Sequence, residues 1–266
     1  MKPDHAQKTV VITGGSSGIG RAAAGRFAAR GDRVYDLSRH SAEDPGVIHI
    51  DADVTKPETL QEAVKAITAE AGGIDLLICC AGMGVSGAVE FIPESDLRRQ
   101  FEVNLFGTIH TVKAVLPGMR EARRGKIICV SSVAAVYAIP FQAYYSASKS
   151  AINAFADALR TEVRPFGISV CAVMPGDIAT GFTAAREKTV AGEDVYTRAA
   201  SAVAKMEQDE RNGMSPDAVA ALIEKLADKK RVAPLYTVGL SYKALVFLKR
   251  LFPASFASKI VAGMYR

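Results

Sequence analysis

The feature of this chain that most constrains its fold is the alternation of short apolar runs with longer stretches of helical periodicity. The runs that predict strands are residues 9–13, 33–38, 47–53, 74–82, 125–132 and 167–176. Helices are predicted between them, over about 18–30, 57–71, 95–122 and from 143 onward. Strands that are apolar on both faces and separated by helices indicate a parallel sheet covered on both sides. The sequence therefore predicts a three-layered, doubly wound α/β fold.

No internal repeat, low-complexity tract or linker divides the 266 residues, so a single domain over 1–266 is expected. Residues 177–214 keep a helical pattern but are rich in Ala, Glu, Lys and Gly. This predicts a mobile lid over the carboxyl ends of the strands, where such sheets bind ligands. A short strand and then a helical extension over 240–266, split by Pro253, are predicted for the tail.

The composition narrows the class of function. The net charge of +5 has no long run of one sign, which argues against a nucleic-acid partner. The four histidines lack metal-ligand spacing, so no metal site is predicted. Four cysteines without a C-x-x-C pair lie in apolar runs and are interpreted as buried thiols of a reducing compartment: Cys79, Cys80, Cys129 and Cys171. The polar start and the absence of an apolar run of about 18 residues predict a cytoplasmic location.

A glycine-rich turn joins the first strand to the first helix in TVVITGGSSGIGRAAA. Gly14, Gly18 and Gly20 permit a tight turn and a close approach of the backbone, and the N–H groups at the helix start suit a pyrophosphate. The spacing is G-x-x-x-G-x-G, which differs from the commonest dinucleotide fingerprint. We predict a Rossmann-like site in which the loop also contributes Ser16, Ser17 and Ile19.

The end of the second strand indicates which dinucleotide binds. An acidic residue there pairs with the ribose hydroxyls of NAD, whereas an arginine accommodates the additional phosphate of NADP. The strand ends in Ser38-Arg39, and a guanidinium beside a small hydroxyl suits a phosphate. Asp36 has the spacing of an NAD-binding acid, but it is placed within the strand. The sequence therefore favours NADP(H) over NAD(H).

A tyrosine and a lysine stand one helical turn apart in AYYSASKSAINAF, residues 143–155. Apolar residues at steps of three and four predict a helix here, and positions i and i+4 share one side of a helix. Tyr145 and Lys149 are therefore neighbours, while Tyr144 points away from the lysine.

With these motifs, the chain resembles the single-domain branch of the short-chain dehydrogenase/reductases over about residues 8–185. The resemblance is carried by TGGSSGIG, DADV, FEVNLFG, VSSVAA, YSASK and MPGDIAT, in that order. It implies Ser132, rather than Ser131, as the catalytic serine and Asn104 as the structural and catalytic asparagine. It also implies contacts to the cofactor from Asp53, Val54, Ala81, Gly82, Pro175, Gly176, Ile178, Thr180, Tyr145 and Lys149. The family's usual N-A-G is Cys80-Ala81-Gly82 here, and a thiol cannot replace an amide's paired hydrogen bonds.

The resemblance implies reduction of a ketone by hydride transfer, with Tyr145 as the acid or base. A lysine cation about 5 Å from the phenol, at an effective dielectric constant of about 20, stabilises phenolate by roughly 3 kcal/mol, so the pKa of Tyr145 is expected to fall by about two units. Ser132 would bind the carbonyl oxygen. The backbone carbonyl of Asn104 would hold a water that links Lys149 to solvent.

The substrate is expected to be a small hydrophobic ketone, either a steroid or a lipid. Largely apolar residues after the strand ends are predicted to line its pocket: Met83, Val133, Tyr137, Phe141 and Phe182. The helical tail favours a likeness to hydroxysteroid, retinol-type or carbonyl-reductase members over the 3-oxoacyl-type reductases. A nucleotide-binding sensor or scaffold without turnover is the alternative from another class.

The tail itself has three candidate uses. It can pack on the body, form the surface of a homodimer or homotetramer, or make a weak contact with a membrane surface. The apolar residues of 245–252 and the cations beside them fit each of these uses.

Overall fold

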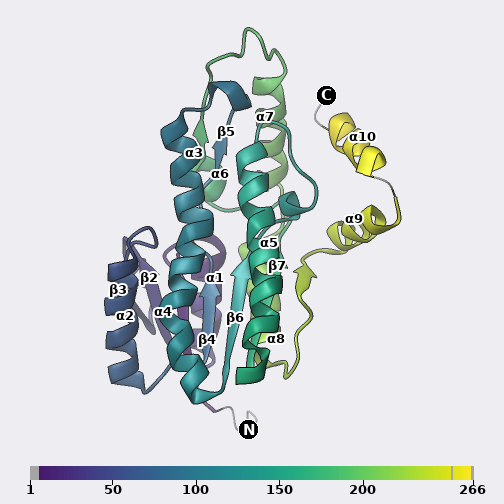
Figure 1. Cartoon of the computed structure of the whole chain (residues 1–266). Helices are drawn as coiled ribbons and strands as arrows, with labels where there is room; N and C mark the ends of the chain where they lie inside the picture. The colour runs from purple at the N-terminus through teal and green to yellow at the C-terminus, as the bar shows by residue number, and fades with distance from the viewer. Residues whose placement is uncertain (1–5, 253, 265–266) are drawn as a thin grey trace.

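A single parallel sheet forms the middle of the molecule in the computed structural model, which describes residues 6–252 and 254–264. Its strand order is β3-β2-β1-β4-β6-β7-β9, and every neighbouring pair is parallel (Figure 1). The strands are β1 (Thr9–Thr13), β2 (Arg33–Ser38), β3 (Val47–Asp51), β4 (Leu76–Cys79), β6 (Gly125–Val130), β7 (Ile168–Met174) and β9 (Leu235–Thr237). The predicted doubly wound α/β fold is therefore confirmed.

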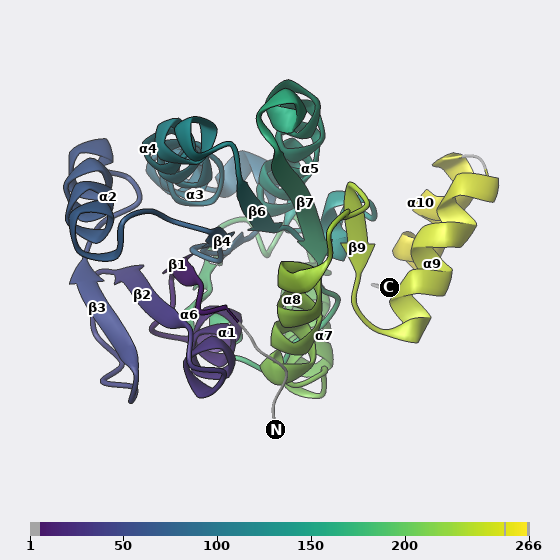
Figure 2. The ribbon, with the colours of Figure 1, turned by 90° about the horizontal axis from the view of Figure 1, so that it is seen from below.

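Helices cover both faces of the sheet, as Figure 2 shows. One face carries α2 (Pro57–Ala71), α4 (Gly107–Ala122) and α5 (Ala143–Val163). The other carries α1 (Gly18–Ala29) and α8 (Pro216–Asp228). Local sequence fixes the helix ends: α2 begins at Pro57, where the missing N–H is harmless, and ends before Gly72, whose φ is +78°.

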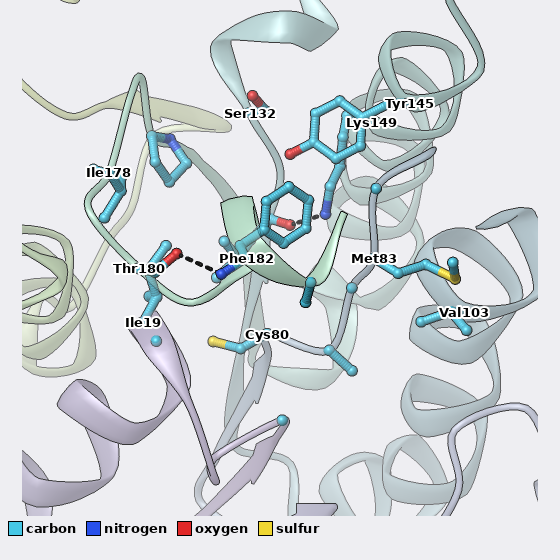
Figure 3. A pocket seen from close by; sticks show the side chains of 18 of the residues that line it. Ile19, Cys80, Met83, Val103, Ser132, Tyr145, Lys149, Ile178, Thr180 and Phe182 are labelled. Atoms are coloured by element: carbon cyan, nitrogen blue, oxygen red, sulfur yellow. Dashed lines mark hydrogen bonds between the residues drawn. The ribbon is translucent and has the colours of Figure 1, made fainter. Parts of the chain in front are cut away.

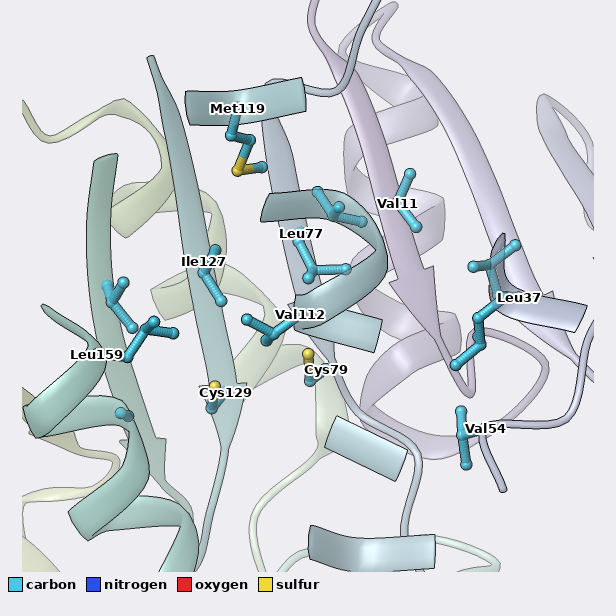
Figure 4. Close-up of a cluster of buried hydrophobic side chains, with 14 of the residues drawn as sticks. Val11, Leu37, Val54, Leu77, Cys79, Val112, Met119, Ile127, Cys129 and Leu159 are labelled. Carbon is cyan, nitrogen blue, oxygen red and sulfur yellow. The ribbon is translucent and has the colours of Figure 1, made fainter. Parts of the chain in front are cut away.

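The sheet separates the two main clusters of the hydrophobic core, and a third, smaller cluster packs against residues of 235–261. In β1, Val11 faces the α2–α4–α5 side, and Val10 and Ile12 face the α1–α8 side. Figure 4 shows part of the first cluster, in which Leu77 and Ile127 lie between the strands and helices. Each such fully buried side chain contributes about 1.5–3 kcal/mol relative to an exposed one. Burial on both faces explains why the central strands, such as β1 and β4, are continuously apolar.

The strand order reverses next to β1, because β2 follows on one side and β4 on the other. The loops after β1 and β4 therefore diverge and leave a crevice at the carboxyl ends of the strands, which is where such sheets bind ligands. Helix α3 (Glu94–Phe101) continues through a π-helical turn, η2 (Glu102–Phe106), into α4. Single 3₁₀ turns lie at η1 (Val89–Phe91), η3 (Val133–Ala135) and η4 (Arg164–Phe166).

Residues 177–214 lie at the carboxyl end of the sheet. They form α6 (Phe182–Ala185), β8 (Glu187–Lys188) and α7 (Ala199–Arg211), and β8 pairs with β5 (Val85–Ser86). Figure 1 shows α6 and α7 above the central strands. The mobility of this segment and the single domain over 1–266 stay predictions.

The C-terminal helices α9 (Leu240–Leu251) and α10 (Ala254–Met264) lie outside the three layers, beyond the β9 edge (Figure 2). The predicted strand and two helical stretches are thus present, although Pro253 and residues 265–266 of the predicted extension lie outside the described residues, as do residues 1–5. Within the described residues, none of the helices combines the length and apolar character that a membrane crossing requires.

Candidate active site

A cavity of about 750 Å³ opens at the carboxyl ends of the central strands (Figure 3). At one end it is lined by the glycine-rich loop after β1, and at the other by Ser132, Tyr145 and Lys149. The structure therefore brings the two predicted halves of the site into one space. The predicted cofactor residues that line it are Gly14, Ser16, Ser17, Gly18, Ile19, Gly20, Ser38, Arg39, Asp53, Val54, Ala81, Gly82, Pro175, Gly176, Ile178 and Thr180.

The glycine-rich loop packs too closely on neighbouring backbone to accept a side chain at two of its glycines. Gly14 has a φ of +69°, and a Cβ there would lie 3.0 Å from the backbone of Ala81. A Cβ on Gly20 would lie 2.2 Å from the Gly14 carbonyl oxygen. The loop therefore holds its backbone against the cavity at the start of α1, whose N–H groups and positive dipole end fit a pyrophosphate.

The end of β2 shows what Asp36 does. It is 2% exposed; its Oδ1 accepts a hydrogen bond from the Gly15 N–H at 2.7 Å and its Oδ2 accepts one from the Ser38 hydroxyl at 2.6 Å. Asp36 therefore braces the glycine loop and is absent from the cavity wall. Arg39 is exposed and lines the cavity.

Asp53 follows β3 on the same wall. Burial raises the pKa of Asp53, but the backbone N–H and hydroxyl of Thr55 and the charges of Arg39 and Lys56 lower it overall. This end of the cavity thus presents the stabilised carboxylate of Asp53 near the exposed guanidinium of Arg39.

Tyr145 and Lys149 project into the cavity from α5, and Ser132 lies across from them at the end of β6 (Figure 3). The Lys149 ammonium lies 5.8 Å from the centre of the Tyr145 ring and donates to the Val130 carbonyl oxygen at 3.0 Å. The Ser132 Oγ accepts from the Ala134 N–H at 3.1 Å, which fixes its rotamer at the start of η3.

The pKa values of this pair differ from the sequence-based expectation. Burial raises the pKa of Tyr145 to about 12, an effect that the hydrogen bond with Ser132 reduces but does not cancel. Burial likewise lowers the pKa of Lys149 to about 8. The expected fall in the pKa of Tyr145 is therefore wrong for the protein alone. Removal of water from the phenol is the dominant effect on Tyr145, and the Lys149 ammonium makes its hydrogen bond to the Val130 carbonyl.

Asn104 lies behind the cavity wall, fully buried within the π-helical turn η2. Its side chain accepts from the Met83 N–H at 2.8 Å and donates to the Met83 carbonyl at 3.0 Å and the Ser148 hydroxyl at 3.1 Å. It therefore ties the loop after β4 to the helix that carries Tyr145. Its backbone carbonyl accepts from the Thr108 hydroxyl at 2.9 Å.

The predicted substrate residues Met83, Val133, Tyr137 and Phe182 line the cavity. The Phe182 ring lies 5.8 Å from the Tyr145 ring and covers it from the lid side. Phe141 is a correction, because it does not line the cavity. Its φ is +61° and its ring packs edge-on against Tyr196, so the turn before α5 directs it away.

Residues from distant parts of the chain complete the wall and were not predicted. Tyr242, Leu245, Ile260 and Val261 come from α9 and α10, and four polar residues come from α3, the α5 cap and the lid: Arg99, Gln142, Glu187 and Glu210. Asp177, which the sequence analysis did not select, also lines it and accepts from the Tyr242 hydroxyl at 2.5 Å. The amphipathic pattern of the tail was the sequence feature that could have indicated that α9 and α10 contribute to the cavity wall.

Comparison with known proteins decides the family. Residues 8–191 match the family described as "short chain dehydrogenase". The chain belongs to the short-chain dehydrogenase/reductase family. It is therefore an oxidoreductase acting on CH–OH and C=O groups, with a nicotinamide cofactor.

Individual members are similar along most of their length. The chain is 42% identical over 239 residues to a 3-ketodihydrosphingosine reductase of Bacteroides thetaiotaomicron, which covers 86% of this chain and 89% of that protein. It is 33% identical over 252 residues to a probable short-chain type dehydrogenase/reductase of Helicobacter pylori, VdlC, covering 92% and 93%. The structure of a short-chain dehydrogenase from Streptomyces avermitilis superimposes with a TM-score of 0.83 at 28% identity, over 92% of this chain and 94% of that one.

Two features of this family member become clear from the geometry. Where the family has N-A-G, the Cys80-Ala81 backbone is tethered by Thr13, whose hydroxyl accepts from the Cys80 N–H at 3.2 Å and the Ala81 N–H at 3.3 Å. Of the two serines after β6, Ser131 donates its hydroxyl to the Lys149 backbone carbonyl at 3.0 Å. Ser132 is the serine whose hydroxyl hydrogen-bonds with Tyr145.

Proposed function

We propose that this protein is an NADPH-dependent reductase that converts a lipid-like ketone into its secondary alcohol. The observation that carries the proposal is that Ser132, Tyr145 and Lys149 share one continuous cavity with the glycine-rich loop. A site that only held a nucleotide would not need a buried phenol and a buried ammonium at its far end.

Several residues of the cavity would hold the cofactor. The glycine loop and the start of α1 would hold the pyrophosphate, Asp53 and Val54 would flank the adenine, and Ile178 and Thr180 would hold the carboxamide. Arg39 supports NADP(H), because an exposed guanidinium on the cavity wall suits a phosphate and Asp36 is engaged by Gly15 and Ser38. When bound, the nicotinamide supplies or takes up the hydride.

The protein's own groups would supply the proton. A phenol with a pKa of about 12 holds its proton at neutral pH, as the acid of a reduction must. Tyr145 would donate this proton to the carbonyl oxygen while the Ser132 hydroxyl stabilises the charge developing there. Lys149, with a pKa of about 8, would stabilise the phenolate that remains and return a proton to it.

The lining of the cavity supports a lipid-like ketone. Met83, Val133, Phe182 and the C-terminal Leu245 and Val261 surround the space beside Tyr145 with apolar groups. The relative that is 42% identical is named for the reduction of a lipid ketone. Polar groups of the cavity wall, among them the buried Gln142 and the partly buried Glu210, would orient a headgroup.

The test is to follow reduced-nicotinamide absorbance while long-chain 3-ketones, steroid ketones and 3-oxoacyl thioesters are offered with NADPH and then NADH. We expect turnover of the long-chain ketones with NADPH and a loss of at least 100-fold in Tyr145→Phe, which keeps the ring but removes the proton. Turnover confined to steroids or thioesters would contradict the substrate class. NADPH binding without any turnover, unchanged in Tyr145→Phe, would instead support a sensor or scaffold.

A further inference from the structure

The C-terminal segment differs in charge from the rest of the chain. Eight of the 33 Lys and Arg residues, and none of the 28 Asp and Glu residues, lie in 229–266. This segment therefore has a formal charge of +8, while residues 1–228 have −3. The net charge of +5 for the whole chain is therefore the sum of a slightly acidic part and the strongly basic segment 229–266.

The same segment exposes apolar side chains. On α9 and the residue after it, five large hydrophobic residues are exposed: Leu240 (83%), Phe247 (59%), Leu248 (42%), Leu251 (62%) and Phe252 (44%). At 100° per residue, Leu240, Phe247, Leu248 and Leu251 fall on one side of the helix. Exposed Lys243 flanks them on α9, and exposed Lys259 lies on α10.

The opposite side of α9 is bound to the active-site wall. The Tyr242 hydroxyl donates to Asp177, the Leu245 carbonyl accepts from the Tyr137 hydroxyl at 2.8 Å, and the Lys249 ammonium donates to the Val136 carbonyl. Tyr242 and Leu245 line the cavity, as do Ile260 and Val261 of α10. One short helix thus faces the cavity on one side and exposes an apolar side to solvent on the other. Figures 1 and 2 show this helix beyond the β9 edge of the sheet.

We propose that the outer side of α9, with α10, docks on an anionic lipid bilayer surface, with the helices lying in the interface. Apolar residues flanked by cations are the features that hold an interfacial helix, and 12 and 11 residues are too few to span a bilayer. A second copy of the chain fits this face less well, because a symmetric contact through α9 and α10 would bring Lys243 and Lys259 of each copy together, and neither helix has an Asp or Glu side chain to pair with them.

This location has a consequence for substrate access, which rests on the proposed function. A long-chain ketone partitions into membranes, and the helices that touch the bilayer would also wall the cavity that receives the ketone. Docking would then place the cavity beside the lipid phase, so that the chain of the substrate need not cross water.

The experiment measures sedimentation of the full chain with vesicles of phosphatidylcholine alone or with added phosphatidylglycerol. We expect binding to the anionic vesicles that weakens as salt is raised. Phe247→Asn/Leu251→Asn should lower the partition coefficient at least tenfold, because it removes the apolar contact. The matched control Ile48→Asn/Val89→Asn alters two residues of similar exposure, 41% and 49%, away from the C-terminal helices and should bind as the wild type does.

A charge-reversed variant separates the two contributions. Lys243→Glu/Lys259→Glu should weaken binding to anionic vesicles and leave binding to phosphatidylcholine vesicles unchanged. Retained NADPH binding in each variant shows that the fold is intact.

Two results would overturn the proposal. The first is that the wild-type protein stays in the supernatant with both kinds of vesicle. The second is that light scattering shows a dimer for the wild type and a monomer for Phe247→Asn/Leu251→Asn, while the two proteins bind vesicles equally. A second copy of the chain would then cover this face. Neither result depends on turnover, so failure of the lipid-ketone assay would contradict the proposed function and leave the docking result standing.

Discussion

Burial decides the chemistry of the reactive residues. Tyr145 and Lys149 both lie in the buried end of the cavity, where the low dielectric constant favours the neutral form of each side chain. The pKa of Tyr145 is therefore raised to about 12, and that of Lys149 is lowered to about 8. A sequence shows that the two side chains are neighbours on a helix, but it does not show how much water surrounds them. The spacing therefore predicted the pair correctly and the sign of the change in the phenol pKa wrongly.

The buried lysine carries a stability prediction. Below about pH 8 Lys149 is charged in both the folded and unfolded states, so its burial opposes folding in full. Between about pH 8 and 10.5 the folded state has released a proton that the unfolded state still holds, so stability from this group rises with pH. Lys149→Met should raise the free energy of unfolding at pH 7 by about 1–2 kcal/mol, because roughly 3 kcal/mol of desolvation is relieved and the bond to Val130 is lost.

Urea unfolding at pH 7 and at pH 9.5 checks this, and the advantage of Lys149→Met should shrink at the higher pH. Reductase activity should fall at least 100-fold in the same variant, as expected where function requires a destabilising residue. Lys113→Met, at an exposed position on α4, is the control and should change stability by less than about 0.5 kcal/mol. A variant that is less stable than the wild type at pH 7 would show that Lys149 is not a destabilising charge.

Arg39 allows a test of the coenzyme preference. Arg39→Asp removes the guanidinium expected to bind the additional phosphate and places a carboxylate near the ribose. The ratio of kcat/KM for NADPH to that for NADH should fall roughly 10- to 100-fold, the range expected from one or two charged hydrogen bonds. Coenzyme kinetics measure this directly, and a wild-type preference for NADH would show that Ser38-Arg39 does not bind the phosphate.

At the scale of elements, the hydrophobic periodicity of the sequence predicts the bounds of strands and helices, which local interactions determine. Strands β1 and β2 and helix α2 have the bounds predicted for them, because their burial on one or two faces is visible in the periodicity. What the sequence could not show are contacts between elements. The bond of Asp36 to Gly15 and the bonds of Thr13 to Cys80 and Ala81 join loops that only the parallel pairing of β1 with β2 and β4 brings together. Phe141 was misplaced for a related reason, because its direction depends on a backbone with positive φ.

Thr13 tests the tether that replaces the family's asparagine. Thr13→Val keeps the shape but leaves the Ala81 N–H without its acceptor, while the Cys80 N–H keeps the Thr13 carbonyl at 3.2 Å. We expect a loss of about 1–3 kcal/mol in the free energy of unfolding and a several-fold rise in the Kd for NADPH, because Ala81 and Gly82 line the cofactor cavity. Thr68→Val, on the exposed side of α2, is the matched control. Equal effects of the two substitutions in urea unfolding and NADPH titration would rule out the tether.

At the scale of the whole molecule, the cavity is closed by segments far apart in sequence. The glycine loop and α5 carry the predicted cofactor and catalytic residues, while residues 177–214 and α9 supply other walls. The hydrogen bond from the Tyr137 hydroxyl to the Leu245 carbonyl, for example, joins residues 108 positions apart. The shape of these walls limits which substrates fit, and the motif of Ser132, Tyr145 and Lys149 does not specify that shape. The substrate class is therefore the part of the function that is hardest to predict from the sequence.

Tyr242 is where the inner side of α9 is fixed to this wall, and it provides the last prediction. Its hydroxyl donates to Asp177, whose pKa burial raises, and its ring occupies the space that a Cβ on Gly176 would fill. The same hydroxyl accepts from the Asp177 N–H at 3.2 Å. Tyr242→Phe removes both bonds and keeps the ring, so α9 should loosen from the cavity without unfolding. KM for a long-chain ketone should then rise about three- to tenfold, and KM for a short, water-soluble ketone should rise less, because only the longer chain reaches Leu245 and Val261. Tyr236→Phe removes a hydroxyl that accepts from the Ala233 N–H at 2.7 Å and does not line the cavity, so it should leave both KM values unchanged. If Tyr242→Phe alters both ketones equally, α9 positions the cofactor side of the site rather than the substrate chain.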